Sequence, residues 1–553
     1  MLEQDAMSGG LPEASLMEHQ PKRLRLLYEP LCLLRILSEV RGDRIKPGDI
    51  FPEGPGLSAT KSYRSFVDAI AYICAYRKRP GYVTAAALEQ TPDAIVILLA
   101  ANDGIDTAVV TLLEKVLIIL SWIIENPTVR LDTKEGREVM KILTVHVLGL
   151  NAPKIFEYYQ QVNKLVSLVM GRLNAEPKLK GTQPCLLRER LLLDIKADKA
   201  LPPRVDQDSI INLRKWISTH LSKEGLQLQE KDMQNLALSS YRDREVFKAL
   251  HHTTGSLEHS HNFEQLHNLL YKLGKHVAQC KRLIEATIRL RLELSRGLRI
   301  ETIGRSRENQ IPLLARTCDI DNISHRIFSD PVKQDIFLQQ VQQIYSKKEL
   351  DRLLSKDVCK GKTRVHAELL VLDHFEQTGG RFLNEKNKYI GCSKPACYLC
   401  HMFISCHPRG YASPPSHQKL YLNWRLPDVR THEQNAAMRF QHQQNVLLRM
   451  IDTVRGGLIN DIATSVGKQT GFADSTAGGT STIVDIETDL GPGVANLSLE
   501  ELRVMLDRQG GAGRSLRENH MDPKFRPRGF PFYPIEVSVE AESDDSATGG
   551  VDI

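Results

Sequence analysis

The chain has 553 residues, of which 41% are apolar and 25% are charged, and its formal net charge is +6. The length predicts roughly two to four domains, and the apolar share is large enough to bury a core. This net charge is small for a chain of this length, so it does not by itself indicate that the protein binds nucleic acid.

The cysteines are unevenly placed along the chain. Five of the ten lie between Cys359 and Cys406, and the first thirty residues show no charged-then-apolar signal pattern. Clustered cysteines in a reducing compartment bind metal more often than they form disulfides. We therefore expect an intracellular protein, cytoplasmic or nuclear, with a metal-binding cysteine cluster.

The N-terminal part of the sequence predicts helices. Residues 1–28 are polar and aperiodic, so we expect them to be disordered, whereas 29–175 has the pattern of a helical domain. Its most apolar part, Ala108–Ile124, contains Glu114 and Lys115. A spanning helix needs about twenty mostly apolar residues, so we expect a buried core helix here and no membrane association.

A second helical region is predicted at 207–299, and it contains one long amphipathic helix. Apolar residues spaced alternately by three and four positions form a single stripe, which favours packing at a shallow angle against another helix. These residues are Phe263, Leu266, Leu270, Leu273, Val277, Cys280 and Ile284.

The apolar pattern and the composition of the sequence change after residue 300. Between 300 and 430 short apolar runs alternate with helical ones, and Gly, Pro, Cys and His become frequent. This pattern indicates a mixed α/β domain. A helix rich in Gln and Arg is predicted at 431–456.

The remaining segment, 457–553, is rich in Gly, Ser, Thr and Asp and is predicted to be a mostly disordered tail. Ser498 and Glu501 form a capping box before an apolar pattern, which predicts a short helix near 498–509. Such a helix could dock on a protein partner or on the chain itself. The N-terminal helical region is a second surface on which a protein partner could bind.

Two short motifs within 300–430 indicate chemistry at a metal. Cys397 and Cys400 begin a helical pattern, and cysteines at i and i+3 of a helix point to the same side. The helix N-terminus favours their thiolate form, which is the form that binds metal. A third ligand from another helix start leaves zinc a position for water, as in catalytic sites. His366 fits that place, and the nearby Glu368 could move a proton from the water to a leaving amine.

The pattern His-x-Glu followed by Pro-Ala-Cys-x-x-Cys resembles the cytidine deaminase-like superfamily. In detail it is similar to a group of predicted deaminases that are abundant in fungi and related to bacterial toxin deaminases. The resemblance implies a three-layer α/β/α domain with a mixed sheet, Zn²⁺ bound by His366, Cys397 and Cys400, and Glu368 as the proton shuttle. In this chain Ala396 separates the proline from Cys397, so the loop must absorb one extra residue.

Other residues of this region allow alternatives. Four nearby side chains could complete a closed, four-ligand structural zinc site with Cys397 and Cys400. These are Cys392, His401, Cys406 and His407. A nucleobase could stack on Tyr398, Tyr421 or Trp424, although a place in the core explains each of them as well. From Cys359 to Asp428 ten lysines and arginines face five acidic residues, which suits a phosphate-bearing substrate and also an ordinary solvated surface.

Taken together, the sequence predicts an α+β multidomain protein with a largely helical N-terminal region, a deaminase-like domain and a mostly disordered tail. The predicted function is hydrolytic, zinc-dependent deamination of a nucleobase in a nucleotide or a single-stranded nucleic acid. The alternative is a non-catalytic scaffold or interaction protein that zinc stabilises on a deaminase fold.

Overall fold

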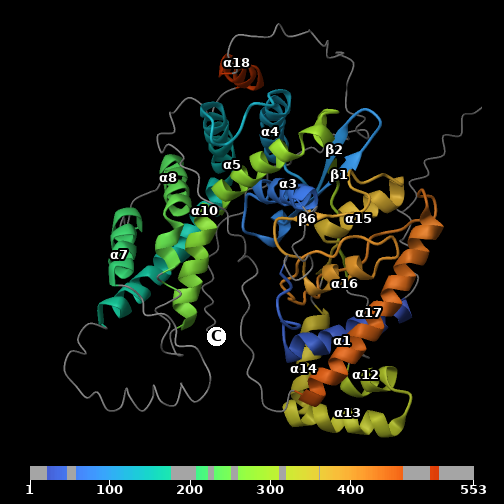
Figure 1. Cartoon of the computed structure of the whole chain (residues 1–553). Coiled ribbons are helices and arrows are strands. Elements are labelled where there is room, and N and C mark those ends of the chain that lie inside the picture. The colour runs from blue at the N-terminus through green and yellow to red at the C-terminus, as the bar shows by residue number, and fades with distance from the viewer. Residues whose placement is uncertain are drawn as a thin grey trace, which may run out of the picture. The chain divides into compact units, whose positions relative to one another are not determined.

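The computed structural model describes most of the chain (Figure 1). The described residues are 21–46, 58–175, 207–221, 229–248, 250, 260–310, 319–359, 362–464 and 498–509. The prediction of disorder for 1–28 and 457–553 falls largely outside these ranges. Residues 21–28 and 457–464 depart from it, because they belong to helices α1 (Pro21–Leu37) and α17 (Ala436–Thr464).

A mixed four-stranded sheet joins parts of the chain that lie far apart in sequence. Its strands, in spatial order, are β3 (Leu298–Ile303), β2 (Ile95–Ala101), β1 (Thr84–Gln90) and β6 (Gly391–Cys392). β1 pairs antiparallel with both β2 and β6, and β2 pairs parallel with β3. A second, two-stranded sheet pairs β4 (Asn309–Gln310) with β5 (Lys362–Thr363).

The strands β1 and β2 correct the prediction that 29–175 contains helices alone. Nearly all of their residues are buried, so apolar side chains follow one another instead of alternating with polar ones. Such short apolar runs cannot be distinguished from buried helix by their periodicity. Because these strands pair with β3 and β6, the sheet crosses the boundary predicted at residue 300.

Alternate residues of β1 and β2 enter two different hydrophobic clusters. Leu88, Ile97 and Leu99 pack with the helices of the N-terminal half, whereas Ala87 and Leu98 pack with helices that include those of the deaminase-like region. The first group of helices is α3 (Ser58–Cys74), α4 (Thr107–Glu125), α5 (Lys134–Ala175) and α10 (Ser260–Arg289). The second includes α1, α15 (Ala367–Thr378), α16 (Tyr398–Cys406) and α17.

The long amphipathic helix predicted from its apolar stripe is present as α10. Leu266, Leu270 and Leu273 are fully buried, and α10 packs against α3, α5 and α8 (Glu230–Arg242). At Gly274 the backbone of α8 comes so close that a Cβ atom would lie 2.6 Å from the amide nitrogen of Tyr241. Glycine thus permits the close approach of the two helices.

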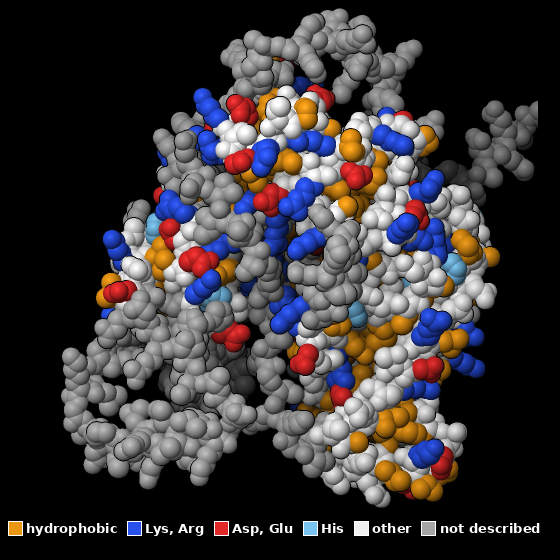
Figure 2. All heavy atoms as spheres, in the orientation of Figure 1, with side chains coloured by type: hydrophobic (Ala, Val, Ile, Leu, Met, Phe, Trp, Pro, Cys, Tyr) orange, Lys and Arg blue, Asp and Glu red, His pale blue; other side chains and the backbone are white. Residues whose placement is uncertain are grey.

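The remaining elements surround these clusters. They are η1 (Pro80–Tyr82), α7 (Gln207–Leu221), η3 (Arg244–Lys248), α11 (Arg291–Leu294), α12 (Ile320–Ile327), α13 (Pro331–Ile344), α14 (Lys347–Cys359) and α18 (Leu499–Gln509). Val332 and Ile336 on α13 are exposed, in a part of the surface where Figure 2 shows apolar side chains gathered.

The predicted tail helix is present as α18 and has the predicted capping box. The amide of Ser498 donates to Glu501 Oε2 at 2.8 Å, and the amide of Glu501 donates to Ser498 Oγ at 3.2 Å. Leu502 and Leu506 are buried, and the helix contacts α4. Within the described residues, this helix therefore docks on the chain itself.

Two of the described helices are long and apolar enough to cross a membrane by length and composition. They are α4 and the part of α5 from 134 to 169, with 44% and 67% of the apolar window buried inside the protein. α4 contacts α5, α10 and β3, as expected for a core helix.

Candidate active site

Two helix starts carry the candidate metal ligands. His366 is the residue before the first turn of α15, with φ −74° and ψ 154°, and Cys397 holds the same position before α16. The amide of Cys400 donates to Cys397 Sγ at 3.3 Å, so the sulfur satisfies one of the free N–H groups of the helix start. This contact turns the thiol of Cys397 towards that of Cys400.

The two helix starts bring an imidazole and two sulfurs together. His366 Nδ1 lies 3.6 Å from Cys397 Sγ and 3.4 Å from Cys400 Sγ. One ligand atom from each of the three buried residues lies within 4.8 Å of the others, which is close enough for all three to hold one ion. The residues predicted as ligands are therefore neighbours in space, and their binding of zinc stays a prediction.

The charges of the three groups depend on each other. Burial alone would raise the pKa of Cys397, but hydrogen bonding to Cys400 and the charge of His366 bring that pKa well below its ordinary value. Burial and the neighbouring Cys397 sulfur raise the pKa of Cys400 well above its usual range. The negative charge of Cys397 outweighs burial at His366 and raises the pKa of the imidazole. A bound cation would favour the thiolate form of both sulfurs.

Glu368 lies in the first turn of α15 beside this group. Its side chain is only 4% exposed, and Oε2 has no hydrogen-bond partner in the structure. Burial raises the pKa of Glu368, while the charge of His366 lowers it in part. A buried carboxylate oxygen without a protein partner is costly, so Oε2 is available to accept a hydrogen bond from a bound water or substrate group. Together with one nitrogen and two sulfur donors, this environment fits a catalytic zinc ion.

Asn102, at the end of β2, holds the start of α15 in place. Its Oδ1 accepts from the amide of Ala367 at 2.8 Å, and its Nδ2 donates to the carbonyl of Pro80 at 2.9 Å. The hydroxyl of Ser306 accepts from the amide of Val365 at 2.9 Å. Sequence reasoning missed both residues, because neither belongs to a motif and both lie far from His366 along the chain.

None of the four residues that could close the site joins the three candidate ligands, although the thiol of Cys392 is hydrogen-bonded to Glu368. Among the described residues, no fourth His, Cys, Asp or Glu joins His366, Cys397 and Cys400. His401 Nδ1 donates to the carbonyl of Pro414 at 2.8 Å, and His407 belongs to a different cluster. This arrangement favours a site with an open position over a closed structural one.

The extra residue before Cys397 is absorbed by a contact with a later segment. Ala396 is buried, its amide donates to the carbonyl of Pro415 at 2.8 Å, and its carbonyl accepts from Ser416 Oγ at 2.9 Å. The amide of His417 also donates to that carbonyl, at 3.1 Å. The insertion thus ties the cysteine loop to residues 415–417.

The three aromatic residues predicted to contact substrate differ in exposure. Trp424 is 0% exposed and packs edge-on against Phe403, with 6.2 Å between ring centroids, which favours its role in the core. Tyr398 and Tyr421 are half-buried. Burial and the charge of Cys397 raise the pKa of Tyr421 to about 12, and its ring lies 5.7 Å from that of His417. Tyr421 therefore lies within electrostatic range of Cys397, and the side chain of Trp424 interacts with that of Cys400.

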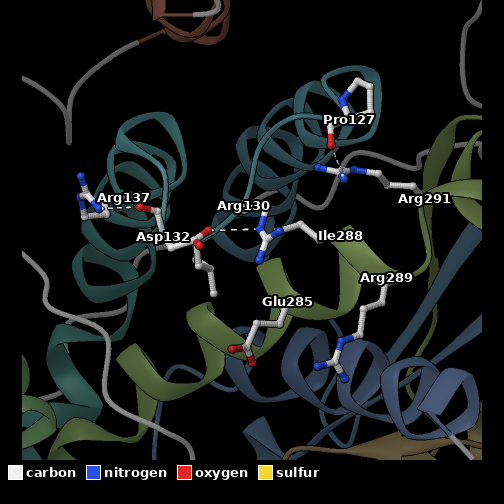
Figure 3. Close-up of a pocket in the computed structure, with 9 residues that line it drawn as sticks. Pro127, Arg130, Asp132, Arg137, Glu285, Ile288, Arg289 and Arg291 are labelled. Atoms are coloured by element: carbon white, nitrogen blue, oxygen red, sulfur yellow. Dashed lines mark hydrogen bonds and ion pairs between the residues drawn. The ribbon is translucent and has the colours of Figure 1, made fainter.

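A separate pocket lies where the loop between α4 and α5 faces α10 (Figure 3). None of the predicted site residues lines it. Arg291 reaches across to the loop and donates to four backbone carbonyls, while Arg130 pairs with Asp132 at 3.3 Å. These contacts make Arg291 a clamp on the C-terminal end of α4.

Comparison with known proteins supports a deaminase domain here. Residues 365–428 match the family model of the OTT_1508-like deaminases. The matched segment contains His366, Glu368, Cys397 and Cys400. No curated protein and no solved structure matches the chain.

Proposed function

We propose that this protein is a zinc-dependent hydrolytic deaminase that acts on a nucleobase in a nucleotide or a nucleic acid. The observation that carries the proposal is the convergence of two helix starts, which places His366, Cys397 and Cys400 beside the unpartnered carboxylate oxygen of Glu368. The match to a deaminase family over the same residues supports it. We further propose the three-layer arrangement of the cytidine deaminase-like superfamily and an intracellular location.

In this proposal the metal would be held by one imidazole and two thiolates. When bound, zinc would supply Lewis-acid activation of a water molecule. Glu368 would take a proton from that water and pass it to the departing amine, so that the C–NH₂ group of the base becomes C=O and ammonia is released. Asn102 and Ser306 would act by fixing the start of α15, without touching the substrate.

A phosphate-bearing substrate fits the charges near the site. The pKa of His417 is lowered to about 4, mainly by burial. The charge of Cys397 opposes this shift, and the positive charges of Lys419, Arg44 and Lys394 contribute to it. A field of this sign attracts an anionic substrate towards the metal ligands. We propose that these side chains lie along the path of the substrate phosphate.

The test is a deamination screen with the full chain and its Glu368→Gln variant. Nucleosides, nucleotides and single-stranded oligonucleotides that contain cytosine, adenine or guanine are incubated with protein of known zinc content. Ammonia and the mass of each base are then measured. We expect deamination by the wild type, and a rate at least about 100-fold lower for the variant, because general acid–base catalysis contributes this much. Zinc content should be unchanged.

The matched control is Glu349→Gln, which alters an exposed glutamate on α14 and should keep full activity. Equal rates for Glu368→Gln and wild type would contradict the proposed role of Glu368. A wild type that carries zinc and releases ammonia from no base would favour the non-catalytic scaffold.

A further inference from the structure

A second group of side chains of the types that bind metals lies at the other ends of the two helices of the candidate active site. Glu376 is in the last turn of α15, and His407 follows the last residue of α16. His442 comes from α17. Glu376 and His407 are only 2% and 5% exposed. The two helices whose N-terminal ends carry the candidate active site thus meet a third helix at this group.

The three side chains are close enough to share one ion. Glu376 Oε2 lies 2.9 Å from His442 Nδ1, and the rings of His407 and His442 have centroids 5.4 Å apart. One ligand atom from each residue lies within 4.8 Å of the other two. Two imidazoles and a carboxylate are a donor set that proteins use for Zn²⁺.

The two oxygens of Glu376 have different partners. Oε1 accepts from Tyr411 Oη at 2.6 Å and from Arg409 Nη1 at 3.2 Å, whereas Oε2 is the oxygen next to His442. Carboxylates that bind metal through one oxygen commonly have supporting hydrogen bonds of this kind. Tyr411 and Arg409 therefore orient Glu376 so that one of its oxygens stays directed at the imidazole.

The backbone also favours a cation at this position. The free carbonyls of a helix C-terminus carry a partial negative charge, and both α15 and α16 end here. The guanidinium of Arg409 already binds at this negative helix end, because it donates to the carbonyl of Phe375 as well as to Glu376. A metal ion would bind Glu376 Oε2, because Arg409 donates to the other oxygen, Oε1.

We propose that Glu376, His407 and His442 form a second zinc site, separate from the candidate active site, which joins α15 and the end of α16 to α17. The rival explanation is an ion-free network in which His442 donates a hydrogen bond to Glu376. The two explanations differ in the number of zinc ions that the folded chain holds, which is two in the first case and one or none in the second.

The test is metal content and Co²⁺ spectroscopy of the full chain. Metal is first removed from the protein with a chelator. One sample is then loaded with Zn²⁺, and the number of zinc ions per chain is measured. A second sample is loaded with Co²⁺, and its absorption spectrum is recorded. We expect two ions per chain in the wild type and one in His442→Ala and in Glu376→Gln. The near-ultraviolet band of cobalt bound to thiolate should persist in both variants, because that band reports the cysteine site. Cys400→Ser should lose the band and keep the second ion.

His374→Ala is the matched control, because His374 lies on α15, is about as buried as His442 (15% against 17% exposed) and pairs with Glu89 instead. It should keep two ions, and circular dichroism checks the fold of each variant. The proposal is overturned if the folded wild type binds a single ion that Cys400→Ser removes, or if Glu376→Gln and His442→Ala still bind two. A wild type that shows no thiolate band and binds one ion, which His442→Ala removes, would instead count against the proposed active site alone.

Discussion

At the scale of single residues, Asn102 makes the sharpest prediction outside the motif. Replacing it with alanine removes the acceptor for the amide of Ala367, which is the first residue of α15 after His366. Side chains that orient metal ligands typically contribute about 10-fold to 100-fold in metal affinity. We expect Asn102→Ala to weaken zinc binding at the candidate active site at least about tenfold, as measured by competition with a chromogenic chelator.

The control for this prediction is Asn126→Ala. Asn126 is half-buried and donates to the carbonyl of Trp122 at the end of α4, away from the metal ligands. It should lose some stability without losing zinc affinity. Equal zinc affinities for Asn102→Ala and wild type would show that His366 does not depend on this contact.

The candidate metal ligands could be predicted from the sequence, but the residues that hold them in position could not. Two cysteines three positions apart, and a histidine two positions before a glutamate, carry a spacing that chemistry restricts. Asn102 lies 265 residues before the amide it holds, and an asparagine at the end of a strand has no distinctive pattern. Only the pairing of strands brings it to the site.

At the scale of elements, Gly274 tests the packing of α10 on α8. Alanine favours a helix over glycine by about 1 kcal/mol, so propensity alone predicts a gain in stability from Gly274→Ala. A Cβ atom there would lie 2.6 Å and 2.8 Å from backbone atoms of Tyr241, which can move only if the helices separate. We expect a net loss of about 1–3 kcal/mol in the free energy of unfolding, measured by denaturant titration.

Gly456 in α17 provides the matched comparison. A Cβ atom at this position would meet no other atom within 4 Å, so Gly456→Ala should raise the free energy of unfolding by about 0.5–1 kcal/mol. If Gly274→Ala also stabilised the protein, the close approach of α10 and α8 would not exist in solution.

Helices and strands could be predicted from the sequence where the spacing of apolar residues distinguishes a helix from a strand. The apolar stripe of α10 repeats over many turns, and a strand cannot reproduce that spacing. The capping box at Ser498 likewise predicted α18. In β1 and β2 burial on both faces removes the alternation that marks a strand, and alanine-rich Thr84–Gln90 has the composition of a helix. Propensity there is overridden by pairing with neighbouring strands.

At the scale of the whole molecule, the order of the strands limits how the chain can be divided. β1 and β2 stand between β3 and β6, so the central part of the sheet comes from residues 84–101. We expect a fragment of residues 298–464 to be insoluble or molten, as judged by gel filtration and near-ultraviolet circular dichroism, because it lacks the two middle strands.

Co-expression with residues 21–297 should restore a soluble zinc-binding complex, since that fragment supplies β1, β2 and the Asn102 contact. A fragment 298–464 that folds and binds zinc alone would contradict this topology. It would also favour the independent domain that the sequence predicted at 300–430.

The central claim is that His366, Cys397 and Cys400 hold one zinc ion with a position left open beside Glu368. The most direct measurement is anomalous diffraction at the zinc edge from crystals of the full chain. The account predicts a peak at about 2.0–2.3 Å from the three ligand atoms, with no fourth protein ligand and with Glu368 unbound. A peak enclosed by four protein ligands, or no peak between these residues in zinc-loaded crystals, would contradict it.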